Sequence, residues 1–224
     1  MSAILSGFLS YYHRFFSNAD TNKTRNKDMI RWLYKNSKSN NQNPSIYIVL
    51  TRSKSIAAKA VEIYKHDEFT HAAISLDSGL KTLYSFGRKW VRFPFIGCFC
   101  NEVLDKGFYA THETLPGVII RLDITKAQYR RALKIISQFI KNKDAYKYNF
   151  LGFFGNVLGL EFKSEYRYTC SEFVAFVLQQ SGIVEFDTPL NLIRPQQLAN
   201  IKGHVIYKGD LKQYNLYANN SKIA

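Results

Sequence analysis

The sequence is poor in cysteine, with three residues in a chain of 224, at positions 98, 100 and 170. An odd and small number gives no disulfide framework, and no second cysteine pair completes a four-ligand zinc site. Cys98 and Cys100 would point to the same side of a strand. We interpret both as small, buried or half-buried residues. We expect no cofactor and no metal.

The sequence also has no long hydrophobic run, since no stretch approaches the roughly 20 apolar residues of a membrane span. Residues 1–9 are apolar but have neither a basic leader nor a clear cleavage site, which argues against a signal peptide. There is no internal repeat and no recognisable nucleic-acid-binding motif, such as zinc-finger spacing or a helix-turn-helix. These absences predict a cytoplasmic protein, in keeping with free thiols, and no specific nucleic-acid partner.

Acidic residues are few: 17 Asp and Glu stand against 31 Lys and Arg, a formal charge of +14. Such an excess favours nucleic acid, anionic lipid or an acidic protein as a partner. The codon bias of an AT-rich genome explains the charge equally well, because the chain is also rich in Asn, Ile and Tyr. The apolar content of 46% and the aromatic content of 15% indicate a folded globular protein. The length is sufficient for one substantial core.

Two segments near the N-terminus separate an extension from the main domain. Residues 1–16 carry apolar side chains at helical spacing, and this amphipathic helix would pack on the core, on a partner or, as a peripheral attachment, on an anionic membrane surface. Residues 35–44 are polar and rich in asparagine and serine, as linkers are. The sequence therefore predicts a helical extension with its linker over 1–44, one main domain over 45–210 and a tail over 211–224.

Hydrophobic periodicity and turn residues predict the elements of the main domain. Strands are expected at 45–50, 71–77, 80–86, 118–122 and 204–207, with a two-residue turn at Ser78-Gly79 and a further short strand within 88–105. Helices are expected at 55–65, from the capping box of Thr125 and Gln128 to 141, at 170–180 and, briefly, from Pro195. Residues 146–160 should form a loop with helical turns. The order is an α+β pattern, with an antiparallel sheet and the helices grouped on one side.

Residues 168–177, Tyr-Thr-Cys-Ser-Glu-Phe-Val-Ala-Phe-Val, place Cys170 in the first turn of a helix. A helix N-terminus carries partial positive charge and free N–H groups, which favour a thiolate over a thiol. Polar residues follow the cysteine, and the buried apolar stripe begins only at Phe173. Cys170 therefore lies at the N-terminus of the helix, before this stripe. A buried structural cysteine is the plain alternative, but this position favours a nucleophile.

His71 opens an alternating strand far upstream, in residues 69–77, Phe-Thr-His-Ala-Ala-Ile-Ser-Leu-Asp. A lone histidine on a strand is usually a packed or exposed side chain. Here, Ala72 and Ala73 follow it, and such small residues would let a helix pack closely and bring a thiol within hydrogen-bond reach of the imidazole. A cysteine at a helix N-terminus facing a histidine on a strand is the arrangement of papain-like thiol enzymes.

These motifs, in this order, resemble the circularly permuted NlpC-type papain-like cysteine hydrolase family, and within it the YaeF/YiiX-like branch. The more distant lecithin:retinol acyltransferase-like group shares the order of histidine before cysteine. The likeness covers about residues 45–208 and rests on His71 with its hairpin, on residues 84–88 (Tyr-Ser-Phe-Gly-Arg) and on residues 169–174. It implies a permuted papain-like catalytic domain. In such a domain, Cys170 would attack an amide or ester as a thiolate, with His71 as the base.

The third catalytic residue is less well defined. Catalytic imidazoles are usually oriented by a carboxylate, an amide or a second histidine. The resemblance implies a Glu on the next strand, where this chain has none, and the family pattern puts Ser85 at that place. A two-residue turn pairs His71 with Phe86, and a turn one residue longer pairs it with Ser85. Asp77 shares the face of His71 but lies roughly 20 Å along the strand. The candidates are Ser85, a backbone carbonyl or a distant group.

Four further residues are candidates for substrate contacts. Tyr168, Tyr146 and Tyr148 either line the substrate cleft or pack as ordinary aromatics. Arg88 either grips an anionic group of the substrate or forms a surface ion pair. The favoured function is a cysteine hydrolase of amide or ester bonds. The alternatives are a lipid-directed thiol acyltransferase or lipase at a membrane surface, and a non-enzymatic basic binding module with a vestigial site.

Overall fold

The computed structural model describes residues 44–52, 67–88, 97–104, 109–150 and 164–214, together with residues 31, 152, 160 and 161. The chain divides into two compact units, Met1–Asn40 and Asn41–Ala224. Within the first unit only Arg31 is described. The helices expected over 1–16 and 55–65 lie outside the described residues, as do the expected linker apart from Pro44 and the end of the expected tail.

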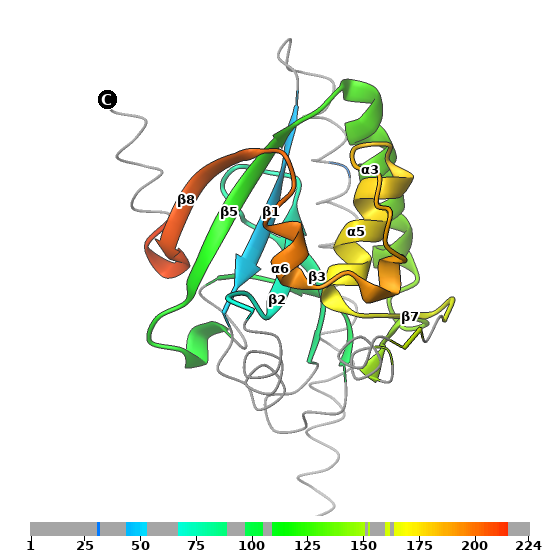
Figure 1. Cartoon of the computed structure of the whole chain (residues 1–224), viewed down its shortest axis with the longest axis horizontal. Helices are drawn as coiled ribbons and strands as arrows, with labels where there is room; N and C mark the ends of the chain where they lie inside the picture. Colours follow the sequence, from blue (N-terminus) through cyan, green and yellow to red (C-terminus); the bar gives the residue numbers. More distant parts are fainter. Residues whose placement is uncertain are drawn as a thin grey trace, which may run out of the picture. The chain divides into compact units, whose positions relative to one another are not determined.

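Eight strands form one sheet in the order β7-β6-β4-β3-β2-β1-β5-β8 (Figure 1). The strands are β1 Ser45–Thr51, β2 His71–Ser75, β3 Leu83–Arg88, β4 Gly97–Glu102, β5 Pro116–Asp123, β6 Lys147–Tyr148, β7 Arg167–Tyr168 and β8 His204–Asp210. The recorded pairings are antiparallel except that of the short strands β6 and β7, which is parallel. The expected α+β class with a largely antiparallel sheet is confirmed.

Strand β1 lies inside the sheet, between β2 and β5. It is buried from Ile46 to Thr51 because both of its faces are covered, which explains its nearly continuous apolar sequence. One face belongs to a core cluster that joins Tyr47 and Val49 to side chains of neighbouring strands and loops, namely Ala73, Leu80, Leu83, Leu104, Tyr109, Leu115, Ile119, Leu211 and Tyr214.

Aromatic rings join the other face of the sheet to two helices, α3 (Lys126–Lys141) and α5 (Cys170–Gln180). The rings of Phe86 and Phe99 lie 5.5 and 5.4 Å from that of Phe173 in α5. Phe139 of α3 lies 5.0 Å from the same ring. Edge-to-face and tilted rings at these distances add to the stabilisation from burial. Figure 1 shows α3 and α5 side by side along the sheet.

Side-chain caps begin both long helices. The capping box predicted for α3 is confirmed: Thr125 Oγ1 accepts from the Gln128 N–H at 3.2 Å, and Gln128 Oε1 accepts from the Thr125 N–H at 2.9 Å. The short helix α6 (Pro195–Leu198) begins at the predicted proline. Three 3₁₀ turns complete the described structure, η1 Tyr109–Thr111, η2 Leu190–Leu192 and η3 Leu211–Gln213.

The connection between β2 and β3 is longer than predicted. The prediction of a two-residue turn at Ser78-Gly79 is wrong, because β2 ends at Ser75 and the return strand begins at Leu83 instead of Leu80. Leu80 has a φ of 47° and is 2% exposed. The chain therefore adopts a left-handed conformation at a leucine, which is uncommon, and this places the side chain in the core.

The longer connection changes the register. Ile74 lies opposite Tyr84, and continuing this pairing along both strands places His71 opposite Gly87. The two registers considered from the sequence, with His71 opposite Phe86 or Ser85, are both wrong.

Other differences concern short elements. The strand expected within 88–105 is confirmed as β4, whereas β6 and β7 were not predicted, since two-residue strands show no periodicity. Strand β8 continues three residues beyond Tyr207, to Asp210. Among the described residues, no helix is both long enough and apolar enough to cross a lipid bilayer.

Gly117 of β5 lies against the neighbouring backbone. A Cβ there would clash with the Leu50 carbonyl oxygen and lie 2.7 Å from Leu211 Cδ1. We expect Gly117→Ala to reduce the free energy of unfolding by about 1–3 kcal/mol, because the strand must shift. Gly79→Ala in the exposed turn is the control, since a Cβ there meets nothing closer than 3.3 Å. Urea denaturation gives the comparison, and equal stabilities of the two variants would contradict this packing.

Candidate active site

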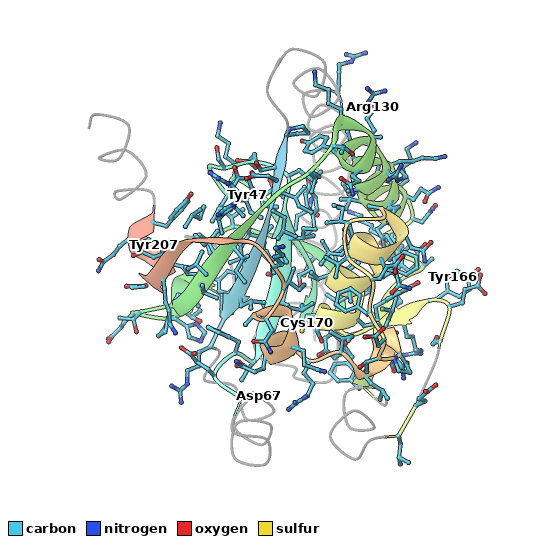
Figure 2. All side chains as sticks on the ribbon, turned by 45° about the horizontal axis from the view of Figure 1, so that its top comes forward. Tyr47, Asp67, Arg130, Tyr166, Cys170 and Tyr207 are labelled. Atoms are coloured by element: carbon cyan, nitrogen blue, oxygen red, sulfur yellow. The ribbon has the colours of Figure 1, made fainter. Side chains whose placement is uncertain are left out.

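Cys170 is the first residue of α5, as predicted (Figure 2). A capping box fixes this helix end: Thr169 Oγ1 accepts from the Glu172 N–H at 3.2 Å, and Glu172 Oε2 accepts from the Thr169 N–H at 3.0 Å. Cys170 is 4% exposed. The thiol therefore lies within the partial positive charge of the helix N-terminus, in a position set by its two capping neighbours.

His71 is the first residue of β2, and its imidazole lies close enough to the Cys170 thiol for a hydrogen bond between them to shift the pKa of both groups. Helix α5 packs against β2. Ala72 is fully buried, and its backbone hydrogen-bonds to the Cys170 sulfur. Ala73 belongs to the core cluster on the opposite face of the sheet. Of the two small residues, Ala72 is therefore the one that allows the close approach of thiol and imidazole.

The second ring nitrogen of His71 meets a carboxylate that the sequence did not identify. His71 Nε2 lies 3.0 Å from Glu102 Oε2, and the two side chains are 16% and 17% exposed. Because a carboxylate only accepts, Nε2 carries the proton and donates it in this bond. Nδ1 is then the nitrogen left for Cys170. Glu102 stands at the end of β4, two strands away from His71.

Glu102 receives two more donors. The Tyr109 hydroxyl donates to Oε2 at 2.9 Å, and the Cys100 thiol approaches Oε1 at 3.5 Å. Several donors on one carboxylate offset the loss of hydration that burial imposes on the charge.

Gly87 of β3 makes the contact between Glu102 and His71 sterically feasible. Strand β3 lies between β2 and β4, so the carboxylate must extend over it. A Cβ on Gly87 would lie 2.8 Å from Glu102 Oε1 and 3.2 Å from Cys100 Sγ. Glycine at this position therefore leaves the space that the carboxylate occupies.

Ser85, the predicted third residue, lies close to His71 but in a lesser role. Its Oγ is 3.4 Å from His71 Nε2, whereas the same hydroxyl donates to the Ala72 carbonyl at 2.7 Å. The shorter, charge-assisted bond of Nε2 goes to Glu102. By these distances Glu102 is the closer partner of the imidazole and the stronger candidate to orient it, while Ser85 holds the backbone of β2 beside it.

Burial opposes ionisation throughout this cluster, and the partners reverse its effect. Burial raises the pKa of the Cys170 thiol, but the hydrogen bond and charge of His71, with hydrogen bonds from the Ala72 and Ser171 backbone, lower it overall. Burial lowers the pKa of His71, but Glu102 and Cys170 raise it well above its usual value. Burial raises the pKa of Glu102, but His71 lowers it overall. The cluster thus favours thiolate, imidazolium and carboxylate together.

Of the three predicted substrate residues, two are tyrosines whose side chains contact other aromatic rings. Tyr168 of β7 packs 5.4 Å from Phe86 and 5.6 Å from Phe176, and burial raises its pKa to about 12. Tyr148 of β6 lies 4.6 Å from Phe150. Arg88 ends β3, and its side chain lies outside the described residues. Tyr146 stacks 4.3 Å from Phe139. For the tyrosines, the packing interpretation describes the contacts seen.

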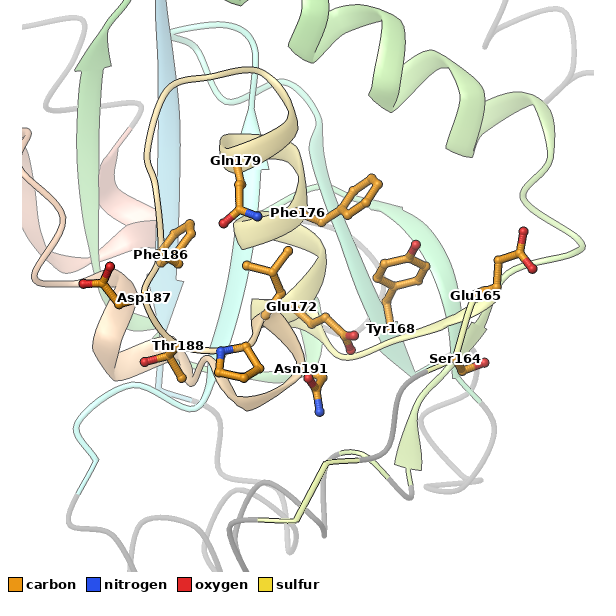
Figure 3. A pocket seen from close by; sticks show the side chains of 12 residues that line it. Ser164, Glu165, Tyr168, Glu172, Phe176, Gln179, Phe186, Asp187, Thr188 and Asn191 are labelled. Atoms are coloured by element: carbon orange, nitrogen blue, oxygen red, sulfur yellow. The ribbon is translucent and has the colours of Figure 1, made fainter.

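A separate open cavity of about 640 Å³ lies beside α5 (Figure 3). Glu172, Phe176 and Gln179, which share one face of the helix, line it together with Tyr168, and burial raises the pKa of Glu172 to about 7. Neither Cys170 nor His71 lines this cavity. Among the described residues, no group of three His, Cys, Asp or Glu side chains could hold a metal ion.

Glu102 could have been found by extending one observation. Alternation predicts that Cys98 and Cys100 share a face of their strand, and the next residue on that face is Glu102. In the structure, Cys100 and Glu102 indeed approach each other. What alternation cannot supply is the distance from that face to His71.

Comparisons with known proteins do not add to this description. No protein-family model matches the chain, and a search of curated proteins finds no significant match.

Replacing Glu102 with glutamine tests its role directly. Glu102→Gln retains a carbonyl that can accept from His71 and Tyr109 but removes the charge. We expect the pKa of His71, followed by NMR titration, to fall by about 1–3, the effect of losing an opposite charge at this distance. Glu113→Gln is the control, because Glu113 is exposed in the loop after η1. An unchanged His71 titration in Glu102→Gln would show that the carboxylate does not stabilise the imidazolium.

Proposed function

We propose that this protein is a cysteine-dependent hydrolase of amide or ester bonds, with the permuted papain-like fold that its motifs resemble. The observation that carries the proposal is the continuous set of contacts from the Cys170 thiol through His71 to Glu102. A nucleophile, a base that touches it and a group that orients the base are the parts that thiol hydrolases need. The order of histidine before cysteine in the chain agrees with a permuted arrangement.

The electrostatics support an enzyme over a vestigial binding module. A cysteine that only packs in a core has no need of a charged partner. Here, the imidazole beside the thiol is paired with a buried carboxylate on its other side, and separating such charges from water is costly unless they are paired. The partners lower the pKa of Cys170 despite its burial, which is the property that makes a thiol reactive at neutral pH.

Acylation follows from this arrangement. The Cys170 thiolate attacks the carbonyl carbon of the substrate, and the electron pair of the C=O bond moves onto oxygen. The N–H of Cys170, among the first helix N–H groups that lack an intrahelical acceptor, donates to this oxyanion. The C=O bond re-forms as the bond to the leaving group breaks. His71 Nδ1 gives its proton to the departing amine or alkoxide, and a thioester remains on Cys170.

Deacylation reverses the roles. His71, now neutral, accepts a proton from water at Nδ1 while the water oxygen attacks the thioester carbonyl. The second oxyanion forms at the same helix end and collapses by breaking the C–S bond. A carboxylic acid is released, and the thiolate–imidazolium pair is restored, with one water consumed. Throughout, Glu102 keeps Nε2 protonated and fixes the plane of the ring.

Alkylation of Cys170 by iodoacetamide tests the proposal before any substrate is known. We expect the alkylation rate to rise with pH in a titration curve whose apparent pKa lies well below the usual thiol value of about 8.5. In His71→Ala, the apparent pKa should return to this value or above it, because burial is the largest effect on this thiol and only the backbone hydrogen bonds then oppose it. The rate is measured by mass spectrometry of the peptide that contains Cys170.

Cys170→Ala is the matched control for the two other thiols. Burial raises the pKa of Cys100 well above its usual value, so Cys100 should label little near neutral pH, and any labelling of Cys98 appears in this variant unchanged. Slow labelling of the wild type, with an ordinary pKa that His71→Ala leaves unchanged, would remove the hydrolase proposal. If the low pKa is found, a screen of amides and esters follows, in which Cys170→Ala must abolish turnover.

A further inference from the structure

Tyr109 stands where it can control the histidine–glutamate pair. It opens η1, is 3% exposed, and donates its hydroxyl to Glu102 Oε2 at 2.9 Å. The same oxygen accepts from His71 Nε2 at 3.0 Å. The Tyr109 ring also meets the His71 ring nearly edge-on, with 6.3 Å between centroids and an interplanar angle of 62°. One tyrosine thus contacts both His71, the base proposed for Cys170, and Glu102, the carboxylate that binds His71.

We propose that Tyr109 is a positioning residue. It holds the Glu102 carboxylate where this group accepts the hydrogen bond of the His71 ring, and thereby sets the pH range over which the Cys170 thiolate exists. The inference deepens the proposed function and rests on it. It assigns a role to a residue beyond Cys170, His71 and Glu102, and it assigns that role to a single hydroxyl group.

The Glu102 side chain needs a further hydrogen-bond donor to fix its conformation, because it must cross β3 to contact His71. Its side chain extends over β3 at Gly87, where no Cβ stands beside it. The Cys100 thiol, at 3.5 Å, is a weak donor. The phenol is therefore the strong donor, other than His71 itself, among the contacts described for this carboxylate. A long acidic side chain without it would sample several rotamers.

Tyr109 is itself held rigidly. Its ring belongs to the core cluster, which also contains Leu83, Leu104 and Leu115. Burial raises its own pKa well above the usual value, and the Glu102 charge adds to this effect. The phenol consequently stays protonated and remains a donor across the pH range in which Cys170 titrates.

The groups that face the cluster come from several elements. His71 belongs to β2, Cys100 and Glu102 to β4, and Cys170 to α5. On β1 and β3, the residues in line with His71 are Thr51 and Gly87, which do not titrate in this range. The pH response of the thiol therefore depends on His71 and Glu102, the two groups that Tyr109 contacts.

Tyr109→Phe removes the hydroxyl and keeps the ring. We expect the apparent pKa of Cys170 in the iodoacetamide assay to rise, so that labelling at about pH 5.5 slows roughly three- to tenfold. The limiting rate at high pH should stay within about twofold of the wild type, because access to the thiol is unchanged. Tyr129→Phe is the control: it removes another buried hydroxyl, one that donates to the Leu76 carbonyl at 3.1 Å.

The outcomes separate the two proposals. A wild type with a low, His71-dependent pKa and an identical profile in Tyr109→Phe would overturn the role of Tyr109 and leave the hydrolase intact. A wild type with an ordinary pKa would overturn both. A uniform slowing at every pH, with the apparent pKa unchanged, would assign Tyr109 a merely structural role and overturn the proposal.

A thermal melt establishes that Tyr109→Phe is folded at the assay temperature. Should it not be, proton NMR of the wild type provides the test. Donation to a carboxylate must move the Tyr109 hydroxyl proton downfield and slow its exchange with water. The absence of such a resonance, in a protein whose Cys170 has a low pKa, would likewise overturn the proposal.

Discussion

The candidate site depends on one charge-assisted hydrogen bond, from His71 Nε2 to Glu102 Oε2 across the intervening strand β3. It sets the tautomer of the imidazole, and so decides which nitrogen faces Cys170. It also reverses the effect of burial on both groups, because each charge stabilises the other. Without the carboxylate, the buried imidazole would favour its neutral form, and the thiol would lose the cation that lowers its pKa.

The sheet and α5 supply the rest of the geometry, each by a simple device. The capping box of Thr169 and Glu172 begins the helix so that Cys170 is its first residue. The small side chain of Ala72 lets that helix end approach β2, and its backbone reaches the sulfur. Gly87 leaves room for the carboxylate over β3. A buried ion pair stabilises a fold only when further hydrogen bonds satisfy it, and here the Tyr109 phenol is one of these.

Local signals predicted the parts of the structure that local interactions form. The capping box at Thr125, the helix from Cys170 and the buried strand β1 follow from residues a few positions apart, and all three are confirmed. The predicted turn of the hairpin after β2 was wrong, because it was inferred from Ser78-Gly79 alone. The actual loop is set by the burial of Leu80, which depends on a core assembled from distant segments. Ser85 became the third catalytic candidate through the family pattern, independently of this turn.

The sequence by itself identified the candidate nucleophile and the candidate base. The chemistry of Cys170 follows from its place at a helix start, and His71 was singled out by its small neighbours and by the resemblance. Only the tertiary structure decided what orients the base. Glu102 is 31 residues from His71, and its contact depends on the order of three strands, their register and a glycine between them. No periodicity within one strand encodes that distance, because side-chain alternation reports the face of a residue and not its neighbour across the sheet.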